Sequence, residues 1–203
     1  EVREVCEFAD YKGSLRVEIS VPGGEELAKR TFNPRLGIAG GISILGTSGI
    51  VEPMSTRAIL DTIRVELNQR KAQGFDYVAV SPGNYGLDFM KKTYGYDLDR
   101  SVKCSNFIGD TVDMAVEMGF RKLLLTGHIG KLVKVAGGIM NTHSKEADCR
   151  MELLAAFCIR EQVERERIYK ILDCVTTEEA VRILKESGKL KPVMEYVVKR
   201  ICY

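Results

Sequence analysis

Four times between residues 42 and 131, an apolar stretch ends in a glycine- or asparagine-bearing turn that leads into a helical pattern. Within the stretches, apolar residues follow one another with little polar alternation, which is typical of strands buried on both faces of a parallel sheet. We therefore expect an α/β fold with a Rossmann-like parallel sheet of about four strands and helices on both faces. A half-Rossmann sheet would place them in the order 3-2-1-4. The predicted strands cover residues 42–45, 75–80, 102–105 and 122–126.

Helices are expected between and after these strands. Ile59, Ile63 and Leu67 recur every fourth residue after Ser55, so they mark one buried stripe on a helix that reaches about residue 72. After residue 131 the pattern is mainly helical. Four other helices are expected. One ends near Gly95 and one spans residues 110–118. A third begins at the capping box formed by Thr176 to Glu179, and the last begins near Pro192.

The N-terminal region has a different pattern. Residues 15–21 alternate apolar and polar side chains and end at Pro22, as a strand would. A single strand cannot bury its apolar face alone, so it needs partners that the sequence does not obviously supply. We interpret residues 1–35 as the tail of an N-terminal α+β domain and residues 36–203 as a Rossmann-like α/β domain with C-terminal helices.

Composition limits the class of protein. The 203 residues carry a net charge of only +2, which argues against bulk electrostatic binding of nucleic acid. No apolar run approaches the roughly 20 residues that span a membrane. The six cysteines include no C-x-x-C pair and are expected to be reduced thiols. We therefore expect a cytoplasmic protein that binds neither nucleic acid nor membrane, and a homo-oligomer stays open.

The turn after the first predicted strand is the strongest candidate for cofactor binding. It carries Gly46, Thr47, Ser48 and Gly49, followed by Glu52. Glycines let the backbone approach a ligand closely, and the hydroxyls and backbone N–H groups offer polar contacts. A tight strand-to-helix turn also needs glycine for structural reasons alone, so a plain turn remains the alternative.

The turns after the second and third strands are expected at the same edge of the sheet. Pro82, Gly83 and Asn84 follow the second strand, and Ser105 and Asn106 follow the third. Ligands of open parallel sheets bind outside the carboxyl ends of the strands, so both turns are expected to line one cleft. Ordinary turn chemistry accounts for these residue types equally well.

Three common kinds of site find no support. A nicotinamide site would need G-x-G-x-x-G and an acid about 20 residues further on, and Gly46 and Gly49 do not have that spacing. The segment from Gly127 to Lys131 is one residue too short for a P-loop and lacks its hydroxyl. No G-x-S-x-G nucleophile motif of a hydrolase occurs.

Basic and imidazole side chains gather after the fourth strand. Lys131 and Lys134 stand three residues apart at the start of a helix, so they are expected to point the same way, where the helix dipole also favours anions. His128 is a candidate for proton handling, with a structural hydrogen bond as the equal alternative. The two histidines do not share a helical face, so no metal site is expected. The candidates for binding an anionic substrate are Gly127, Lys131, Lys134 and His143, together with Arg35 ahead of the first strand.

Several long strings in the chain resemble one protein family. They are FNPRLG at residues 32–37, GGISILGTSGIVEPM at 40–54, TGHIGK at 126–131 and NTH at 141–143. Together they resemble the CbiD family, the cobalt-precorrin-5B C(1)-methyltransferases of anaerobic cobalamin biosynthesis. The family pattern has a further N-terminal region with a Thr/Gly-rich motif, which is absent from this sequence.

The resemblance implies an enzyme that transfers methyl from S-adenosylmethionine to C-1 of cobalt-precorrin-5B, giving cobalt-precorrin-6A. This substrate is a carboxylate-rich tetrapyrrole, and cobalt would arrive with it. The turn at residues 46–49 would then cradle the cofactor, with Glu52 near its ribose hydroxyls or its ammonium group, and the basic residues would meet the carboxylates. A non-catalytic tetrapyrrole- or nucleotide-binding domain is the alternative.

Overall fold

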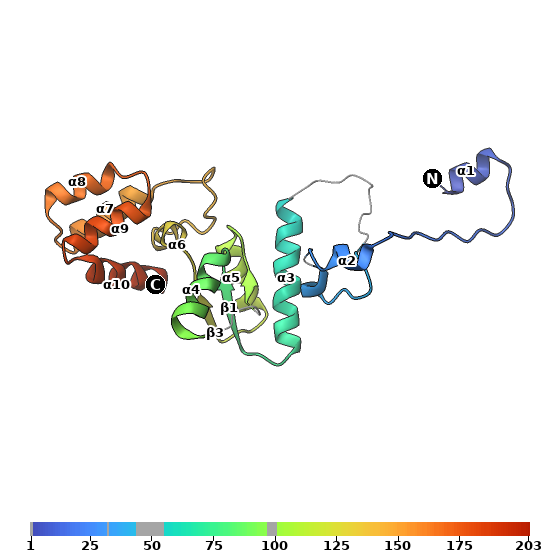
Figure 1. Cartoon of the computed structure of the whole chain (residues 1–203), viewed down its shortest axis with the longest axis horizontal. Coiled ribbons are helices and arrows are strands. Elements are labelled where there is room, and N and C mark those ends of the chain that lie inside the picture. Colours follow the sequence, from blue (N-terminus) through green and yellow to red (C-terminus); the bar gives the residue numbers. More distant parts are fainter. Residues whose placement is uncertain (1, 32, 44–54, 97–100) are drawn as a thin grey trace. The chain divides into compact units, whose positions relative to one another are not determined.

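The computed structural model describes residues 2–31, 33–43, 55–96 and 101–203 (Figure 1). The chain divides into two compact units, residues 1–49 and 50–203. The domain boundary that the sequence predicts after residue 35 stays a prediction.

The described residues of the first unit form two short α-helices, α1 (Val2–Phe8) and α2 (Gly24–Ala28), and the 3-10 helix η1 (Asn33–Leu36). The strand predicted over residues 15–21 is wrong, because these residues form no strand. Leu15, Val17 and Ile19 are all exposed. Without a partner strand, the segment gains neither ladder hydrogen bonds nor a buried apolar face, and alternation alone cannot hold it as a strand.

Three parallel strands form the sheet of the second unit: β1 (Tyr77–Ser81), β2 (Val102–Lys103) and β3 (Lys122–Leu125). They correspond to the second, third and fourth predicted strands. Their order is β2-β1-β3. Val80 lies opposite Val102 in β2 and opposite Leu125 in β3.

The predicted order 3-2-1-4 is therefore wrong. It placed the first predicted strand between the second and the fourth, but β1 and β3 pair directly along four residues. Residues 42 and 43 are not in a strand, and residues 44 and 45 lie outside the described part of the chain. What the structure has is a small open parallel sheet among many helices, and the four-stranded Rossmann-like sheet is not confirmed.

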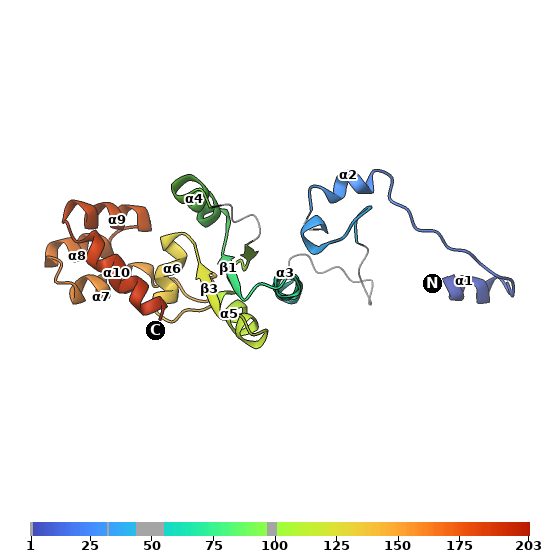
Figure 2. The ribbon, with the colours of Figure 1, turned by 90° about the horizontal axis from the view of Figure 1, so that it is seen from below.

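The helices predicted around the sheet are present: α3 (Thr56–Ala72), α4 (Asn84–Tyr94) and α5 (Ile108–Glu117). Ser55 caps α3 by accepting a hydrogen bond from the Ala58 N–H. The connections β1–α4–β2 and β2–α5–β3 run in opposite directions across the sheet, so right-handed crossovers place α4 and α5 on opposite faces. Figure 2 shows them on opposite sides of the strands.

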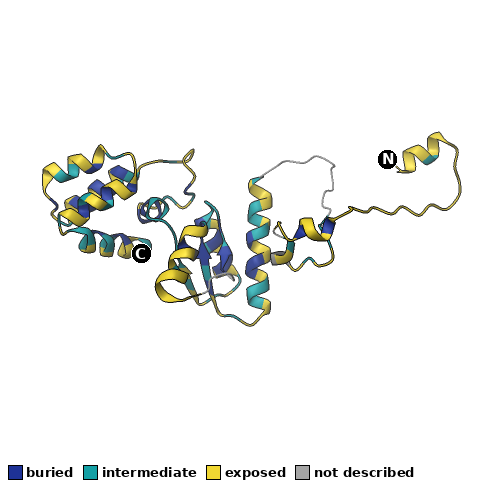
Figure 3. Cartoon of the chain, in the orientation of Figure 1, coloured by how far each residue is buried: buried dark blue, intermediate teal, exposed yellow. Residues whose placement is uncertain are grey.

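A first hydrophobic cluster covers the sheet. Ile63 and Leu67 of α3 are fully buried with Val80 and Val102 of the strands and Ile108 of α5. Of the stripe that the sequence predicts on α3, Ile63 and Leu67 are buried and Ile59 is partly buried, and Figure 3 shows buried, intermediate and exposed parts along this helix.

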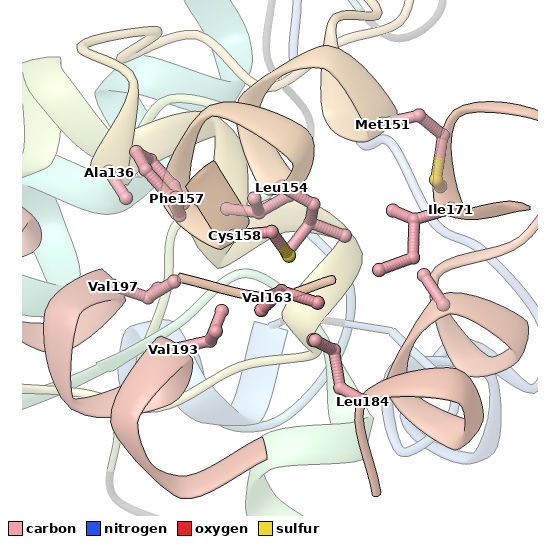
Figure 4. Packing of buried hydrophobic residues seen from close by; sticks show 12 residues of the cluster. Ala136, Met151, Leu154, Phe157, Cys158, Val163, Ile171, Leu184, Val193 and Val197 are labelled. Atoms are coloured by element: carbon pink, nitrogen blue, oxygen red, sulfur yellow. The ribbon is translucent and has the colours of Figure 1, made fainter. Parts of the chain in front are cut away.

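After β3, residues 126–203, which are all described, form five helices: α6 (Ile129–Ala136), α7 (Arg150–Arg160), α8 (Arg165–Leu172), α9 (Thr177–Glu186) and α10 (Leu190–Ile201). Their side chains form a second hydrophobic cluster, centred on residues such as Leu154, Cys158 and Leu184 (Figure 4). Ile201 packs against both clusters, so the helical part and the sheet share a contact. The predicted cap at Thr176 is present, because its hydroxyl accepts from the Glu179 N–H. Among the helices in the described ranges, none combines the length and the apolar character that a membrane span requires.

Candidate functional site

The carboxyl ends of the three strands bring three turns together. Because the strands are parallel, the segments that follow them leave the sheet at the same edge. The Lys131 ammonium lies 3.4 Å from the Pro82 carbonyl oxygen and 3.4 Å from that of Ser105. One side chain of the third turn therefore bridges the other two.

The turn after β1 is held tightly against the turn after β3. A Cβ atom on Gly86 would stand 2.8 Å from Thr126 Oγ1 and 2.9 Å from the Thr126 backbone, so only glycine fits without a shift. The Ser81 hydroxyl donates to the Gly83 carbonyl oxygen at 2.5 Å, and Asn84 Oδ1 accepts from Lys103 Nζ at 2.9 Å.

The turn after β2 is hydrogen-bonded to a segment that lies far from it in the sequence. Ser105 has φ 53°, in the left-handed region that few non-glycine residues adopt. The next residue, Asn106, accepts the Thr142 N–H at its backbone oxygen (2.9 Å) and the Thr142 hydroxyl at its Oδ1 (3.2 Å). These bonds bring the segment around Thr142 to the carboxyl edge.

His128 is the N-cap of α6 and uses both ring nitrogens. Its Nδ1 accepts from the Gly130 N–H at 3.2 Å, and its Nε2 lies 2.9 Å from Glu178 Oε1 at the start of α9. Nδ1 must be unprotonated to accept, so Nε2 carries the proton that Glu178 receives as a hydrogen bond. Tyr85 lies beside the imidazole, with ring centroids 5.6 Å apart. The pKa of Glu178 is lowered, first by the hydrogen bond from its own backbone N–H and then by His128.

Lys131 and Lys134 differ in burial and in their hydrogen-bond partners. The side chain of Lys134 is buried, and its ammonium donates to the carbonyl oxygens of Ala147 (2.6 Å) and Thr142 (3.3 Å). Lys131 is only half-buried, and burial lowers the pKa of its ammonium, with the positive charge of Lys134 adding to the effect. Burial also raises the pKa of the Cys104 thiol to about 12, although the charge of Lys131 acts in the opposite direction, so this thiol stays protonated at neutral pH.

Arg150 and Asp148 form an ion pair near these lysines. Arg150 Nε donates to Asp148 Oδ1 at 2.5 Å, and Nη2 donates to Oδ2 at 2.9 Å. The hydrogen bonds from Arg150 hold the pKa of Asp148 below its ordinary value. Lys134 Nζ stands 3.9 Å from the same carboxylate.

These groups surround a pocket of about 380 Å³. Three cationic side chains line it against one carboxylate, that of Asp148, so the pocket favours anions. His143 lies at its exposed rim, with Nδ1 accepting from the Lys145 N–H at 3.1 Å. Among the described residues, no group of three or more His, Cys, Asp and Glu side chains could hold a metal ion. The pocket is lined by Asn106, His128, Gly130, Lys131, Lys134, Thr142, His143, Ser144, Asp148 and Arg150.

The predicted site residues fall into three groups. The structure brings several of them to one edge of the second unit, and their binding roles stay predictions. The predicted cofactor turn lies outside the described residues, and Arg35 lies in the first unit. The residues at the edge are Pro82, Gly83, Asn84, Ser105, Asn106, Gly127, His128, Lys131, Lys134 and His143. The residues outside the described part are Gly46, Thr47, Ser48, Gly49 and Glu52.

Reasoning from sequence missed four side chains of this site. Tyr85, Asp148, Arg150 and Glu178 come from α4, the α7 start and the α9 start. The capping box placed Glu178 in the first turn of a helix, but no local pattern pairs it with His128, 50 positions earlier. Arg150 and Asp148 carry no motif, and only tertiary packing brings them to the lysines.

Known proteins resemble this chain along nearly its whole length. A protein of Ruminiclostridium cellulolyticum is 51% identical over 200 residues, which cover 98% of this chain and 52% of the relative. A Thermoanaerobacter protein is 47% identical (99% and 54%), and one of Methanocaldococcus jannaschii is 46% identical (92% and 52%). All three are named cobalt-precorrin-5B C(1)-methyltransferase. This chain spans about half the length of these relatives.

Two family descriptions also match the chain. Residues 1–53 match CbiD, and residues 141–203 match the CbiD C-terminal domain. The second match includes His143, Asp148 and Arg150 of the pocket. No solved structure matches. Together, the two family matches and the relatives at about half identity show that the chain belongs to the CbiD family.

Proposed function

We propose that this chain works in an S-adenosylmethionine-dependent methyltransferase that methylates C-1 of cobalt-precorrin-5B, giving cobalt-precorrin-6A in anaerobic cobalamin biosynthesis. The observation that carries this proposal is identity of about 50% to relatives of that name over nearly the whole chain. We further propose a cytoplasmic location without nucleic-acid or membrane partners. Whether the chain forms a homo-oligomer is left open by this proposal.

Methyl transfer needs positioning more than it needs a strong base. When bound, S-adenosylmethionine supplies an electrophilic methyl group for attack by the carbon nucleophile, and the C–S bond to the methyl breaks as the C–C bond forms. The chain's part is to hold the tetrapyrrole so that C-1 faces that methyl in line, which can supply much of the rate enhancement. The cationic pocket supports this role, since it offers charge complementary to a carboxylate-rich substrate.

We propose that the cofactor binds away from this pocket. A sulfonium is a cation, and Lys131 and Arg150 would repel it. This supports the predicted cradle of Gly46, Thr47, Ser48 and Gly49, with Glu52 as its anion. In the second unit, we propose cofactor contacts to Pro82, Gly83, Asn84 and Ser105, which follow strands at one edge of the sheet, whereas Asn106 lines the cationic pocket.

In the second unit we propose substrate contacts to Gly127, Lys131 and His143, and a substrate contact of Arg35 in the first unit stays a separate prediction. Lys134 has its ammonium on backbone carbonyls, which supports a structural role for it. Both nitrogens of His128 are likewise engaged, and proton handling would require one of these bonds to open. Of the two roles that the sequence leaves open for His128, this geometry supports the structural hydrogen bond.

A labelled methyl group tests the function. The chain would be incubated with methyl-¹³C S-adenosylmethionine and cobalt-precorrin-5B, alone and with the part of the Ruminiclostridium relative that this chain does not cover. We expect the label on C-1 of the tetrapyrrole by NMR in at least one of the two mixtures. Binding of both ligands without label transfer in either mixture would favour the non-catalytic binding domain instead.

A further inference from the structure

The cationic pocket is small compared with a tetrapyrrole. Its volume of about 380 Å³ lies at the lower end of ligand pockets. A side arm of the macrocycle therefore suits it better than the whole ring. The polar side chains of Asn106, Thr142 and Ser144 complete its lining.

Arg150 is held in one orientation and keeps donors for a ligand. Asp148 receives two of its five N–H groups, those on the Nε and Nη2 edge. Among the described residues, no other acceptor bonds to the guanidinium of Arg150. The remaining N–H groups are suited to a carboxylate, since a guanidinium fork matches two carboxylate oxygens. Glu178, whose charge also acts on Arg150, has its Oε1 on His128.

Lys131 has a charge that its surroundings only partly balance. Its ammonium is half-buried, and its described partners are two carbonyl oxygens at 3.4 Å, near the limit of a hydrogen bond. No described carboxylate pairs with it. The lowered pKa reflects this burial, and a carboxylate placed beside the ammonium would restore the charged form.

We propose that Arg150 and Lys131 together bind one peripheral carboxylate of the tetrapyrrole, with Asp148 as the residue that positions Arg150. The proposal rests on the function proposed above and names the group that this pocket recognises. Lys134 is not a ligand in this arrangement, because its ammonium ties the segment of Thr142 and Ala147 to α6.

Equilibrium binding of uroporphyrin III, a fluorescent tetrapyrrole with eight carboxylates, tests this in the intact chain. Arg150→Gln and Lys131→Met should each weaken binding about tenfold, the effect of losing one charge-assisted contact. Arg165→Gln on α8 removes an arginine that does not line the pocket and should bind like the parent. A porphyrin with cationic groups in place of the carboxylates should bind at least tenfold more weakly than uroporphyrin.

The proposal is overturned if Arg150→Gln and Lys131→Met both bind uroporphyrin like the parent. Equal losses in Arg165→Gln would overturn it too, since they would indicate general charge attraction. Circular dichroism checks folding, and Arg150→Lys replaces Arg150→Gln if the latter is unfolded, because it keeps the charge and loses the fork. Carboxylate binding without methyl transfer would leave this inference standing and refute the proposed function. If both pocket variants retain full methyl transfer and bind uroporphyrin like the parent, the proposed function stands and this inference is refuted.

Discussion

Lys131 and Lys134 are chemically identical residues three positions apart, yet they differ in burial and in hydrogen bonding. Lys134 has a relative exposure of 4%, and two carbonyl oxygens accept from its ammonium. Lys131 is less buried and less well bonded, and burial lowers its pKa. A cationic group in such a setting is kept at a cost to stability, which is common in binding sites.

The first prediction compares their removal. Lys134→Met should lower the free energy of unfolding by about 1.5–3 kcal/mol, because two carbonyls lose a charged donor. Lys131→Met should be neutral or stabilising at pH 7. The folded pKa of Lys131 lies below its unfolded value, so the charged ammonium costs stability at a pH below its folded pKa, and this cost disappears as the pH rises through the unfolded pKa. Urea denaturation measures both, and equal losses would contradict the division of roles.

Thiol chemistry gives a second prediction about single residues. Burial raises the pKa of Cys104 to about 12 and that of Cys158 to about 11, whereas Cys149 and Cys202 are exposed. Native protein treated with iodoacetamide at pH 8 should be labelled at the two exposed thiols and spared at the two buried ones, as peptide mass spectrometry would show. Labelling of Cys104 as fast as Cys149 would mean that the hydrophobic cluster around the sheet is open to solvent.

At the scale of elements, His128 joins the N-termini of α6 and α9. His128→Ala should cost about 1 kcal/mol through the lost cap, and His128→Asn should recover most of it, since the amide oxygen can accept from the Gly130 N–H. Thermal unfolding compares them, with Glu178→Ala isolating the other bond of the imidazole. If Asn proves no better than Ala, His128 does not cap α6.

Packing of α4 against the end of β3 gives the fourth prediction. Gly86→Ala should destabilise the protein by about 1–3 kcal/mol, because the added methyl meets the Thr126 backbone. Gly83→Ala is the matched control. Its Cβ would have no heavy atom within 4 Å, and its φ of −177° is ordinary extended backbone. Similar unfolding midpoints for both variants would show that the two turns are not in close contact.

The pattern of the sequence predicted elements better than it predicted their order. The strands at β1, β2 and β3 and the helices α3 to α5 lie where periodicity and glycine stops placed them. The order of strands in the sheet depends on pairing between distant segments, which periodicity does not encode. The prediction that the first predicted strand lies between β1 and β3 was therefore wrong. Likewise, the alternation at residues 15–21 is a local property, whereas a strand needs a partner.

The site was predictable only where it follows the strands. Pro82, Ser105 and Lys131 meet because parallel strands end at one edge, which the fold class implies. Arg150 and Glu178 enter from helices of the C-terminal part, through contacts that no spacing in the sequence indicates.

At the scale of the whole molecule, the pocket forms where the sheet and the C-terminal helices of the second unit meet. Its lining comes from the turn after β2, from α6, and from the segment that leads into α7. The sheet and the helices have separate hydrophobic clusters, so the pocket depends on how the two are joined. The chain spans about half the length of its curated relatives, so the complete reaction has to be tested with and without the rest of that length.

Steady-state methyl transfer by the mixture that labels C-1 tests the central claim most directly, namely that this pocket holds the substrate of a CbiD-family methyltransferase. In Arg150→Gln, the apparent KM for cobalt-precorrin-5B should rise about tenfold, while the KM for S-adenosylmethionine stays near that of the parent. Arg165→Gln should match the parent in both constants. An unchanged KM for cobalt-precorrin-5B in Arg150→Gln, or a rise confined to the KM for S-adenosylmethionine, would contradict the account.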